Sequence, residues 1–297
     1  MSYVVKALFR MLNLVPMTWA VAATKGIARL LILLNAKIVQ VARTNIEHCF
    51  SSLSTKAKQR MLSETVANAA LLIFEFAYFR HRPINELLDL VAGVEGEDKL
   101  KEAWAAGEGV ILLVPHFGCW EFLNTYLGHK YPISALYDPP KVLALEDSIV
   151  ATRQRQGTKM HPTTASGLRG LTRGLKSGDL VAVLPDQVPP ESAGRIIAPF
   201  FGRKALTMSL AKRLMRVGSP KVLMAAAWRD TQQGQLRYRV CFEEPEPEIY
   251  SDDDIAYATA MNLGLERITN RAPAQYQWTY KRFKGFADET DAIYRRQ

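Results

Sequence analysis

The chain has 297 residues, of which 48% are hydrophobic and 23% charged, an ordinary composition for a folded protein with one large α/β domain or two small ones. Its net charge of +9 indicates an anionic partner: nucleic acid, a phosphate-bearing lipid or an acidic protein. Nucleic acid is disfavoured because the basic residues are spread along the chain and no binding module is present. The odd count and wide spacing of the three cysteines argue against a disulfide framework and give no zinc-ligand pattern, which favours a reducing, cytosolic-side environment.

The N-terminal segment is unusually apolar. Residues 11–24 carry no charge, and a second apolar run follows at 30–36, but neither reaches the roughly 20 residues of a spanning helix. The segment is either a membrane-anchoring helix, tilted or partly inserted, or an ordinary pair of buried helices. The lysines and arginines around it suit an anionic cytoplasmic leaflet and favour the first. We therefore expect residues 1–42 to form a membrane-associated helical segment and residues 43–297 to form the main domain.

The rest of the chain alternates between strand and helix patterns. Residues 54–80 predict a long helix that begins after Ser54 and is buried in its apolar second half. The expected strands are 109–115, 133–137, 179–185, 221–228 and 235–242, and the other expected helices are 97–107, 119–128, 145–156, 165–178, 207–218 and 252–270. This alternation predicts an α/β fold with a mostly parallel central sheet flanked by helices. Neither GxGxxG nor GxxxxGK[ST] is present, so nothing marks a nucleotide-binding loop.

Two of the expected strands are followed by titratable residues. His116 comes directly after the apolar run at 109–115, and Asp186 directly after the run at 179–185; each is close to a proline. Ligands of α/β sheets bind outside the carboxyl ends of the strands. We therefore expect His116 and Asp186 to converge on one edge of the sheet.

The stretch VPHFGCWEFL at 114–123 adds a second carboxylate, Glu121. Residues five apart point about 140° away from each other in one continuous helix, so His116 and Glu121 meet only if His116 lies in a loop and Glu121 opens the next helix. Gly118 permits such a bend, and the N–H groups of the helix N-terminus are candidates to hold an oxyanion. A carboxylate on one ring nitrogen would make the other a general base. A core histidine satisfied by a carboxylate is the alternative, and Cys119 reads as a core residue more than as a nucleophile.

Longer segments resemble a known family. HFGCWE carries the H-x4-E signature of the bacterial lipid A late acyltransferases, the lauroyl and myristoyl transferases of the lysophospholipid acyltransferase superfamily. Four further segments resemble other elements of that family and occur in the family's order. One lies before the signature, RTNIEHCF at 43–50. Three lie after it: GLRGLTRGLKSGDLVAVLPDQ at 167–187, APFFGRKALT at 198–207 and QYQWTYKRFK at 275–284. The resemblance covers about residues 40–285 and implies a glycerolipid acyltransferase-like fold.

The resemblance implies a role for individual residues. His116 matches the catalytic base and Glu121 its orienting carboxylate, with Gly118 shaping the turn beside the oxyanion. Arg153 matches an arginine linked to activity through substrate contact. Arg155, Asp186 and Arg169 are also expected to contact substrate. Arg155 is so near to Arg153 that the match to the family's arginine could fall on either residue. For Arg169 the alternative is a position on a solvent-exposed helix face. Asp138 departs from the basic residue of many relatives, which bears on the acceptor. Arg282 is expected near the surface or the membrane.

The implied reaction is transfer of an acyl chain from a thioester to a hydroxyl, with no metal and no cofactor other than the acyl donor. The resemblance implies acyl-carrier protein, which is acidic, as donor, with acyl-CoA as the alternative co-substrate. It also implies a phosphorylated lipid A precursor as acceptor and the cytoplasmic face of the bacterial inner membrane as location. A groove must hold the acyl chain, with residues 69–79 and the strand interiors as candidate walls. Three alternatives remain: another acceptor such as a lysophospholipid, an ornithine lipid or a glycolipid; a thioesterase or Cys119 hydrolase; and a non-catalytic basic protein that binds membranes.

Overall fold

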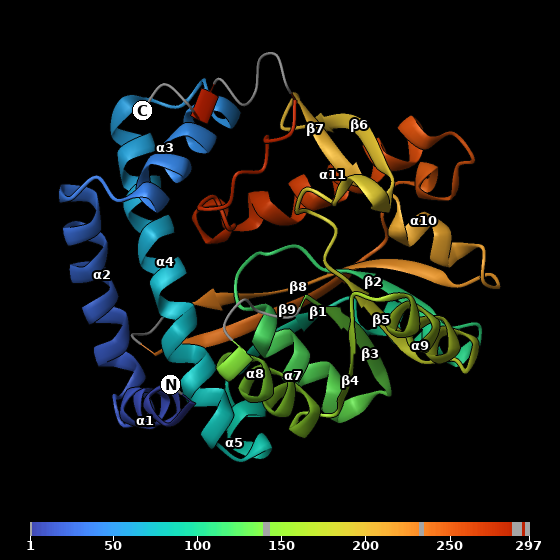
Figure 1. The fold of residues 1–297 in the computed structure, drawn as a ribbon, viewed down its shortest axis with the longest axis horizontal. Helices are drawn as coiled ribbons and strands as arrows, with labels where there is room; N and C mark the ends of the chain where they lie inside the picture. Colours follow the sequence, from blue (N-terminus) through green and yellow to red (C-terminus); the bar gives the residue numbers. More distant parts are fainter. Residues whose placement is uncertain (1, 139–142, 232–234, 287–292, 295–297) are drawn as a thin grey trace.

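One mixed sheet forms the centre of the molecule (Figure 1). The computed structural model describes residues 2–138, 143–231, 235–286 and 293–294. Within these residues seven strands lie in the order β1-β9-β8-β2-β5-β3-β4. Their bounds are β1 (Val91–Glu95), β2 (Val110–Leu113), β3 (Ile133–Tyr137), β4 (Thr158–Pro162), β5 (Leu180–Val183), β8 (Lys221–Asp230) and β9 (Arg237–Glu243). Only β8 and β9 pair antiparallel, so the expected mostly parallel sheet is confirmed.

Helices cover both faces of the sheet. On one side lie α10, α11 and a separate hairpin of β6 (Arg195–Phe200) and β7 (Arg203–Met208), and on the other lie α7 and α8 (Figure 1). The helices are α1 (Ser2–Asn13), α2 (Met17–Leu33), α3 (Lys37–Cys49), α4 (Thr55–His81), α5 (Ile84–Leu88), α6 (Glu97–Ala105), α7 (Trp120–Lys130), α8 (Leu143–Arg155), α9 (Ala165–Lys176), α10 (Leu210–Met215) and α11 (Asp254–Arg271). Strands β1, β4, β6 and β7 are additions to the elements that the sequence predicted.

Strand β2 shows why its apolar run is continuous. Ile111 and Leu113 belong to the core that includes α9, α10 and α11, whereas Val110 and Leu112 belong to the core that includes α6 and α7. All four side chains are fully buried. A strand that is covered on both faces has no solvated side, so alternation of polar and apolar residues is lost.

Helices α1 to α3 stand at one edge of the sheet, with α2 beside α4 (Figure 1). Ala20, Thr24 and Ala28 of α2 are buried, while Trp19 and Leu33 are 72% and 81% exposed. Within the described residues α4 is the one helix long and apolar enough to cross a membrane, and α2 with α3 passes the same test jointly despite an angle of 88°. The expected boundary after residue 42 falls inside α3.

Helix α4 begins as expected, because the Ser54 hydroxyl accepts a hydrogen bond from the Ala57 N–H. Its apolar second half is buried on one side only. Leu71, Glu75 and Phe79 are buried, but Ile73 is 54% exposed. The expectation of burial all round is therefore wrong for this face of the helix.

Candidate functional site

His116 and Asp186 meet at the carboxyl ends of two neighbouring strands. Strands β2 and β5 pair in parallel with Leu113 opposite Val183, and each titratable residue follows its strand end by three positions. The His116 ring Nδ1 lies 2.7 Å from Asp186 Oδ1, and the His116 backbone N–H donates to Asp186 Oδ2 at 2.8 Å. The expected convergence on one edge of the sheet is confirmed.

Asp186 is a buried, ionised partner of the imidazole. Burial by itself raises the pKa of Asp186, but the charge of His116, the hydrogen bonds from its ring and backbone, and the field of Arg282 together hold that pKa below its ordinary value. A carboxylate that accepts from Nδ1 fixes the proton there. The remaining ring nitrogen, Nε2, is then the acceptor, and it lies 3.3 Å from the amide nitrogen of Gln187.

Glu121 has a different partner from the one expected. It opens α7, as predicted, but its two carboxylate oxygens accept from Arg153 of α8, with Nη2 to Oε1 at 2.5 Å and Nε to Oε2 at 3.1 Å. The orienting carboxylate of His116 is therefore Asp186. Sequence spacing favoured the near carboxylate, whereas the register of the two parallel strands brings the distant one into contact.

A cavity of about 490 Å³ opens beside His116. The ends of the strands and the facing sides of α7 and α8 line it mainly with apolar side chains, and His116, Glu121, Arg153 and Gln187 supply polar groups. The apolar lining includes Leu123, Leu127, Ile133, Ala135, Met160, Ala182 and Val183. Strand interiors thus contribute as expected, but residues 69–79 of α4 are absent from this lining. Asp138 stands at the cavity and accepts a hydrogen bond from the Thr163 hydroxyl.

Gly118 makes the turn after His116, as expected. Its φ of +60° is a left-handed conformation, and a Cβ there would lie 2.0 Å from the Ala227 carbonyl oxygen. The expected oxyanion role of its N–H is wrong, because that N–H donates to Gln275 O at 2.9 Å. The N–H groups of His116, Phe117 and Cys119 donate to Asp186, Pro115 and Ala227, respectively, so the whole turn is committed internally.

The two other arginines expected at the substrate lie elsewhere. Arg155 donates to the carbonyls of Phe79 and Arg82 at the end of α4, and it lines a separate cavity. Arg169 is exposed on α9, and its side chain is not part of the lining of the His116 cavity. Arg169 therefore lies on a solvent-exposed helix face, which was the alternative interpretation.

The C-terminal family-like segment supports the site in a way that sequence reasoning missed. Gln277 N–H donates to the His116 carbonyl at 2.9 Å, and Phe117 forms a β-bridge with Tyr276. Asn45 of α3, which is fully buried, donates to the carbonyls of Trp278 and Tyr280 at 2.7 Å. In the sequence, RTNIEHCF and QYQWTYKRFK occur together as family-like segments. That joint occurrence could have indicated the contact, because Asn45 of the first segment binds the backbone of the second.

Arg282 of the same segment was expected near the surface or the membrane, but it is buried. It is 1% exposed and donates to the Leu206 carbonyl at 2.6 Å, with its guanidinium over the Phe200 ring. A charge near a chain end reads as solvated in the sequence, and only the packing of the segment under the β6–β7 hairpin buries it.

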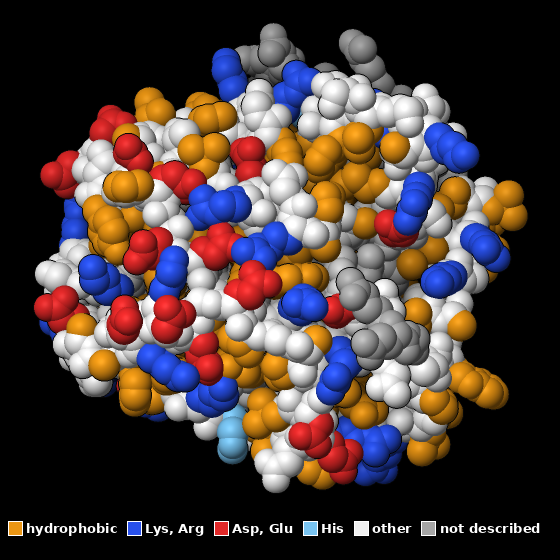
Figure 2. Space-filling view, turned by 180° about the vertical axis from the view of Figure 1, so that it is seen from behind, with side chains coloured by type: hydrophobic (Ala, Val, Ile, Leu, Met, Phe, Trp, Pro, Cys, Tyr) orange, Lys and Arg blue, Asp and Glu red, His pale blue; other side chains and the backbone are white. Residues whose placement is uncertain are grey.

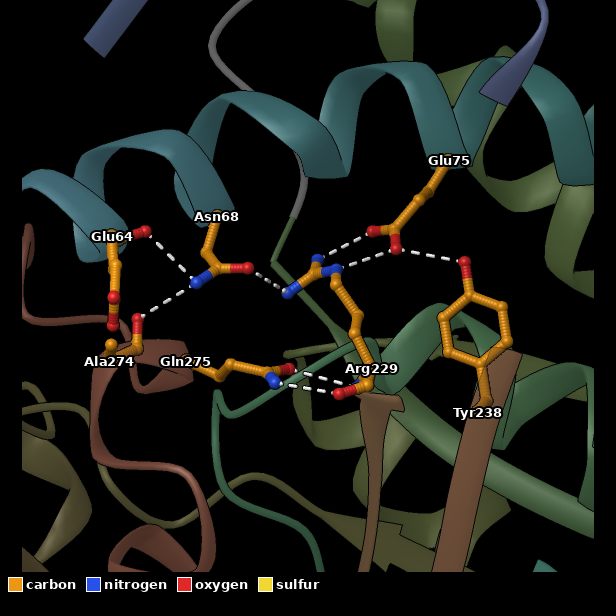
Figure 3. A network of polar contacts seen from close by, with 7 residues as sticks. All are labelled: Glu64, Asn68, Glu75, Arg229, Tyr238, Ala274 and Gln275. Atoms are coloured by element: carbon orange, nitrogen blue, oxygen red, sulfur yellow. Dashed lines mark hydrogen bonds and ion pairs between the residues drawn. The ribbon is translucent and has the colours of Figure 1, made fainter. Parts of the chain in front are cut away.

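A second buried network joins α4 to the sheet (Figure 3). Arg229 donates to both oxygens of Glu75, at 2.5 and 2.7 Å, and Tyr238 donates to the same carboxylate at 2.9 Å. The Gln275 side-chain amide pairs with the backbone N–H and carbonyl of Arg229, both at 2.9 Å. Because the Gln275 carbonyl accepts from Gly118, this network supports the His116 turn from behind.

Cys119 lies between the two networks and has no access to substrate. It is fully buried, and burial followed by the field of Glu75 raises the pKa of its thiol well above the ordinary value. A nucleophilic cysteine needs an exposed thiolate. The structure therefore contradicts a Cys119 hydrolase. Among the described residues no three His, Cys, Asp or Glu side chains gather into a group that could hold a metal ion.

Comparison with known proteins identifies the family of this chain. The family model described as bacterial lipid A biosynthesis acyltransferase matches residues 1–285. The chain is 29% identical over 248 residues to a lipid A biosynthesis palmitoleoyltransferase of Escherichia coli, covering 82% of this chain and 78% of that protein. It is 22% identical over 263 residues to the E. coli lipid A biosynthesis lauroyltransferase, covering 87% and 83%. A lipid A biosynthesis acyltransferase of Haemophilus influenzae is 23% identical over 254 residues, covering 84% and 77%. The chain therefore belongs to the bacterial lipid A biosynthesis acyltransferase family and is an acyltransferase.

Proposed function

We propose that this protein transfers a fatty acyl chain from acyl-carrier protein to a hydroxyl of a lipid A precursor, with His116 as general base. The observation that carries the proposal is the His116–Asp186 pair at the mouth of an apolar cavity. The names of the relatives supply the acceptor class. No cofactor besides the acyl donor is proposed.

The chemistry needs one base and no covalent enzyme intermediate. Asp186 holds the proton on Nδ1, so Nε2 can take the proton of the acceptor hydroxyl. The acceptor oxygen attacks the thioester carbonyl, whose electron pair moves onto the carbonyl oxygen. The pair returns as the carbon–sulfur bond breaks, and the imidazolium gives its proton to the thiolate that leaves.

The acyl chain occupies the apolar cavity in this proposal. Leu127, Ile133 and Met160 are among the apolar residues that line it, and an apolar wall excludes water from the thioester. Glu121 and Arg153 stand at the same cavity as an ion pair. Arg153 is thereby a fixed cation for the donor or for a phosphate of the acceptor.

We place the enzyme on the cytoplasmic face of the inner membrane. Helix α2 presents Trp19, Leu30 and Leu33 to the outside, with Lys25 and Arg29 exposed on the same helix. Figure 2 shows hydrophobic and basic side chains next to each other along the edge to which α2 contributes. Such a surface suits an anionic bilayer interface, and the net charge of +9 suits an acidic carrier protein.

The test is mass spectrometry of membrane lipids from cells that lack the gene, complemented with the wild type, His116→Ala or Gln154→Ala. Gln154 is an exposed α8 residue outside the cavity lining and serves as the matched control. We expect one additional acyl chain on lipid A with the wild type and the control, and none with His116→Ala, which still binds membranes. Near-normal acylation by His116→Ala would overturn the proposal. An added chain on a phospholipid, ornithine lipid or glycolipid would replace the acceptor.

A further inference from the structure

The proposed reaction needs a donor for the oxyanion of the tetrahedral intermediate, and the turn of residues 116–119 offers none. The four N–H groups of residues 116–119 all donate within the fold. Arg153 uses both Nε and Nη2 on Glu121. A preorganised donor at the place where charge develops contributes more to catalysis than most other single groups.

Gln187 is the polar side chain next to the free nitrogen of the base. Its amide nitrogen lies 3.3 Å from His116 Nε2, and it lines the same cavity as His116. The same amide nitrogen lies 3.2 Å from Gln277 Oε1. One N–H of the amide is thereby directed to Gln277 Oε1, and the other faces His116 Nε2.

The orientation of the Gln187 amide follows from the protonation of His116. Because Asp186 holds the proton on Nδ1, Nε2 presents a lone pair, and the amide oxygen would be repelled there. Gln277 Oε1 accepts from the other side and excludes the flipped amide for the same reason. A separation of 3.3 Å is longer than a good N–H···N contact, so an incoming hydroxyl can take the place of Gln187 at Nε2.

We propose that Gln187 is a catalytic residue that donates the amide N–H facing His116 Nε2 to the oxyanion, and that Gln277 is the positioning residue that orients it. This inference rests on the proposed acyl transfer. When the acceptor hydroxyl sits on Nε2 and attacks the thioester, the carbonyl oxygen becomes negative within reach of the displaced N–H. The proton moves to Nε2, the carbon–sulfur bond breaks, and Gln187 supplies no proton of its own.

The experiment compares two reactions of the purified full chain: transfer from lauroyl- or palmitoleoyl-acyl-carrier protein to a lipid A precursor, and hydrolysis of the same thioester when the acceptor is left out. Both pass through the same oxyanion, with water in place of the hydroxyl in the second. For Gln187→Ala we expect kcat to fall about 10²-fold in both, with little change in KM. Gln154→Ala, the exposed control, should keep both rates.

Further variants separate catalysis from folding. Gln187→Met keeps the shape without the N–H and should match Gln187→Ala, with a melting temperature close to that of the wild type. Gln187→Glu sets an anion beside both the oxyanion and the imidazole, so its rate should be lower still and its pH–rate profile should shift to higher pH. Gln277→Ala should lose about 10-fold in kcat, because the amide is still present but no longer oriented.

Three outcomes overturn the inference: kcat of Gln187→Met within about threefold of the wild type, a loss in transfer but not in hydrolysis, or a loss confined to the KM of the acceptor. The second and third would make Gln187 a residue that only binds the acceptor. If the wild type transfers nothing while hydrolysis still depends on Gln187, the proposed function fails and the oxyanion role stands.

Discussion

Two buried glutamate–arginine pairs in this molecule have the same geometry and different surroundings. In both, Nε and Nη2 of the arginine face the two carboxylate oxygens, Glu75 with Arg229 and Glu121 with Arg153. The side chains of the first pair are 0% and 2% exposed, and those of the second are 11% and 22% exposed. The second pair lines the cavity beside His116, and the first does not.

The comparison teaches that bidentate geometry alone does not mark a functional ion pair. Glu75 and Arg229 also engage Tyr238 and Asn68, so nearly every polar atom has a protein partner (Figure 3). Such a pair is a fixed part of the core. Glu121 and Arg153 retain one side that faces the cavity, where a substrate group can join them. We therefore expect loss of the first pair to affect folding and loss of the second to affect the proposed reaction.

The largest expected effect is on the core pair. Arg229→Met leaves the Glu75 carboxylate buried without its cation, and breaking one partner of such a pair costs about 3–5 kcal/mol of unfolding free energy. Urea unfolding in mild detergent measures this loss. The double variant Glu75→Leu with Arg229→Met removes both charges and should recover most of it. A loss below about 1 kcal/mol in Arg229→Met would show that the pair does not hold α4 to the sheet.

The cavity pair should respond in the opposite way. Glu121→Gln keeps the shape but no longer fixes Arg153 as an ion pair, and a displaced catalytic-site cation costs on the order of 10²-fold in rate. The side chains of this pair are 11% and 22% exposed, so the loss of unfolding free energy should be smaller than that for the core pair. Steady-state transfer rates and urea titrations on the same preparation give both numbers. Large destabilisation with a normal rate would make the two pairs alike.

The sequence predicted the half of the site that depends on strand topology. His116 and Asp186 follow apolar runs, and parallel pairing of β2 with β5 brings them together. Which carboxylate reaches the imidazole was not predictable, because Glu121 is near in sequence but is turned toward Arg153 by the path of the chain through Gly118. The fold class needed only hydrophobic patterning, whereas the side-chain partners needed the register.

Amides and buried arginines were missed for another reason. Gln187 and Gln277 do not titrate and fit no spacing rule, so their place beside Nε2 emerges only from three segments that meet in space. Arg282 lies in a basic, aromatic stretch that suggests a surface, and its burial depends on the β6–β7 hairpin, which the sequence did not predict.

Asp186 differs from the arginines of the two ion pairs because acid can remove its charge. Its pKa is lowered in the folded protein, so its ionisation stabilises the fold above the ordinary aspartate pKa, and this stabilisation is lost as pH falls through the lower folded value. Asp186→Asn should therefore be less stable than the wild type at neutral pH, and the difference should shrink as pH falls below about 4. Thermal melts across pH measure it. A difference that persists unchanged at pH 2 would mean that Asp186 acts through shape alone.

The smallest effect belongs to a third paired glutamate, at the surface. The carboxylate of Glu97 accepts from Lys130, Tyr126 and Lys101, and the hydrogen bond from Lys130, followed by the one from Tyr126, lowers its pKa to about 2. The sign is that of a depressed acid: the stabilisation is present above about pH 4.5 and is lost as pH falls toward 2. Because both lysines are solvated, Glu97→Gln should cost less than about 1 kcal/mol at pH 7. Salt at 1 M should reduce that cost through screening, whereas the loss in Arg229→Met should persist because no ions reach the buried pair. If salt changed the stability loss of Glu97→Gln and of Arg229→Met equally, burial would not be the property that distinguishes the core ion pair from the surface one.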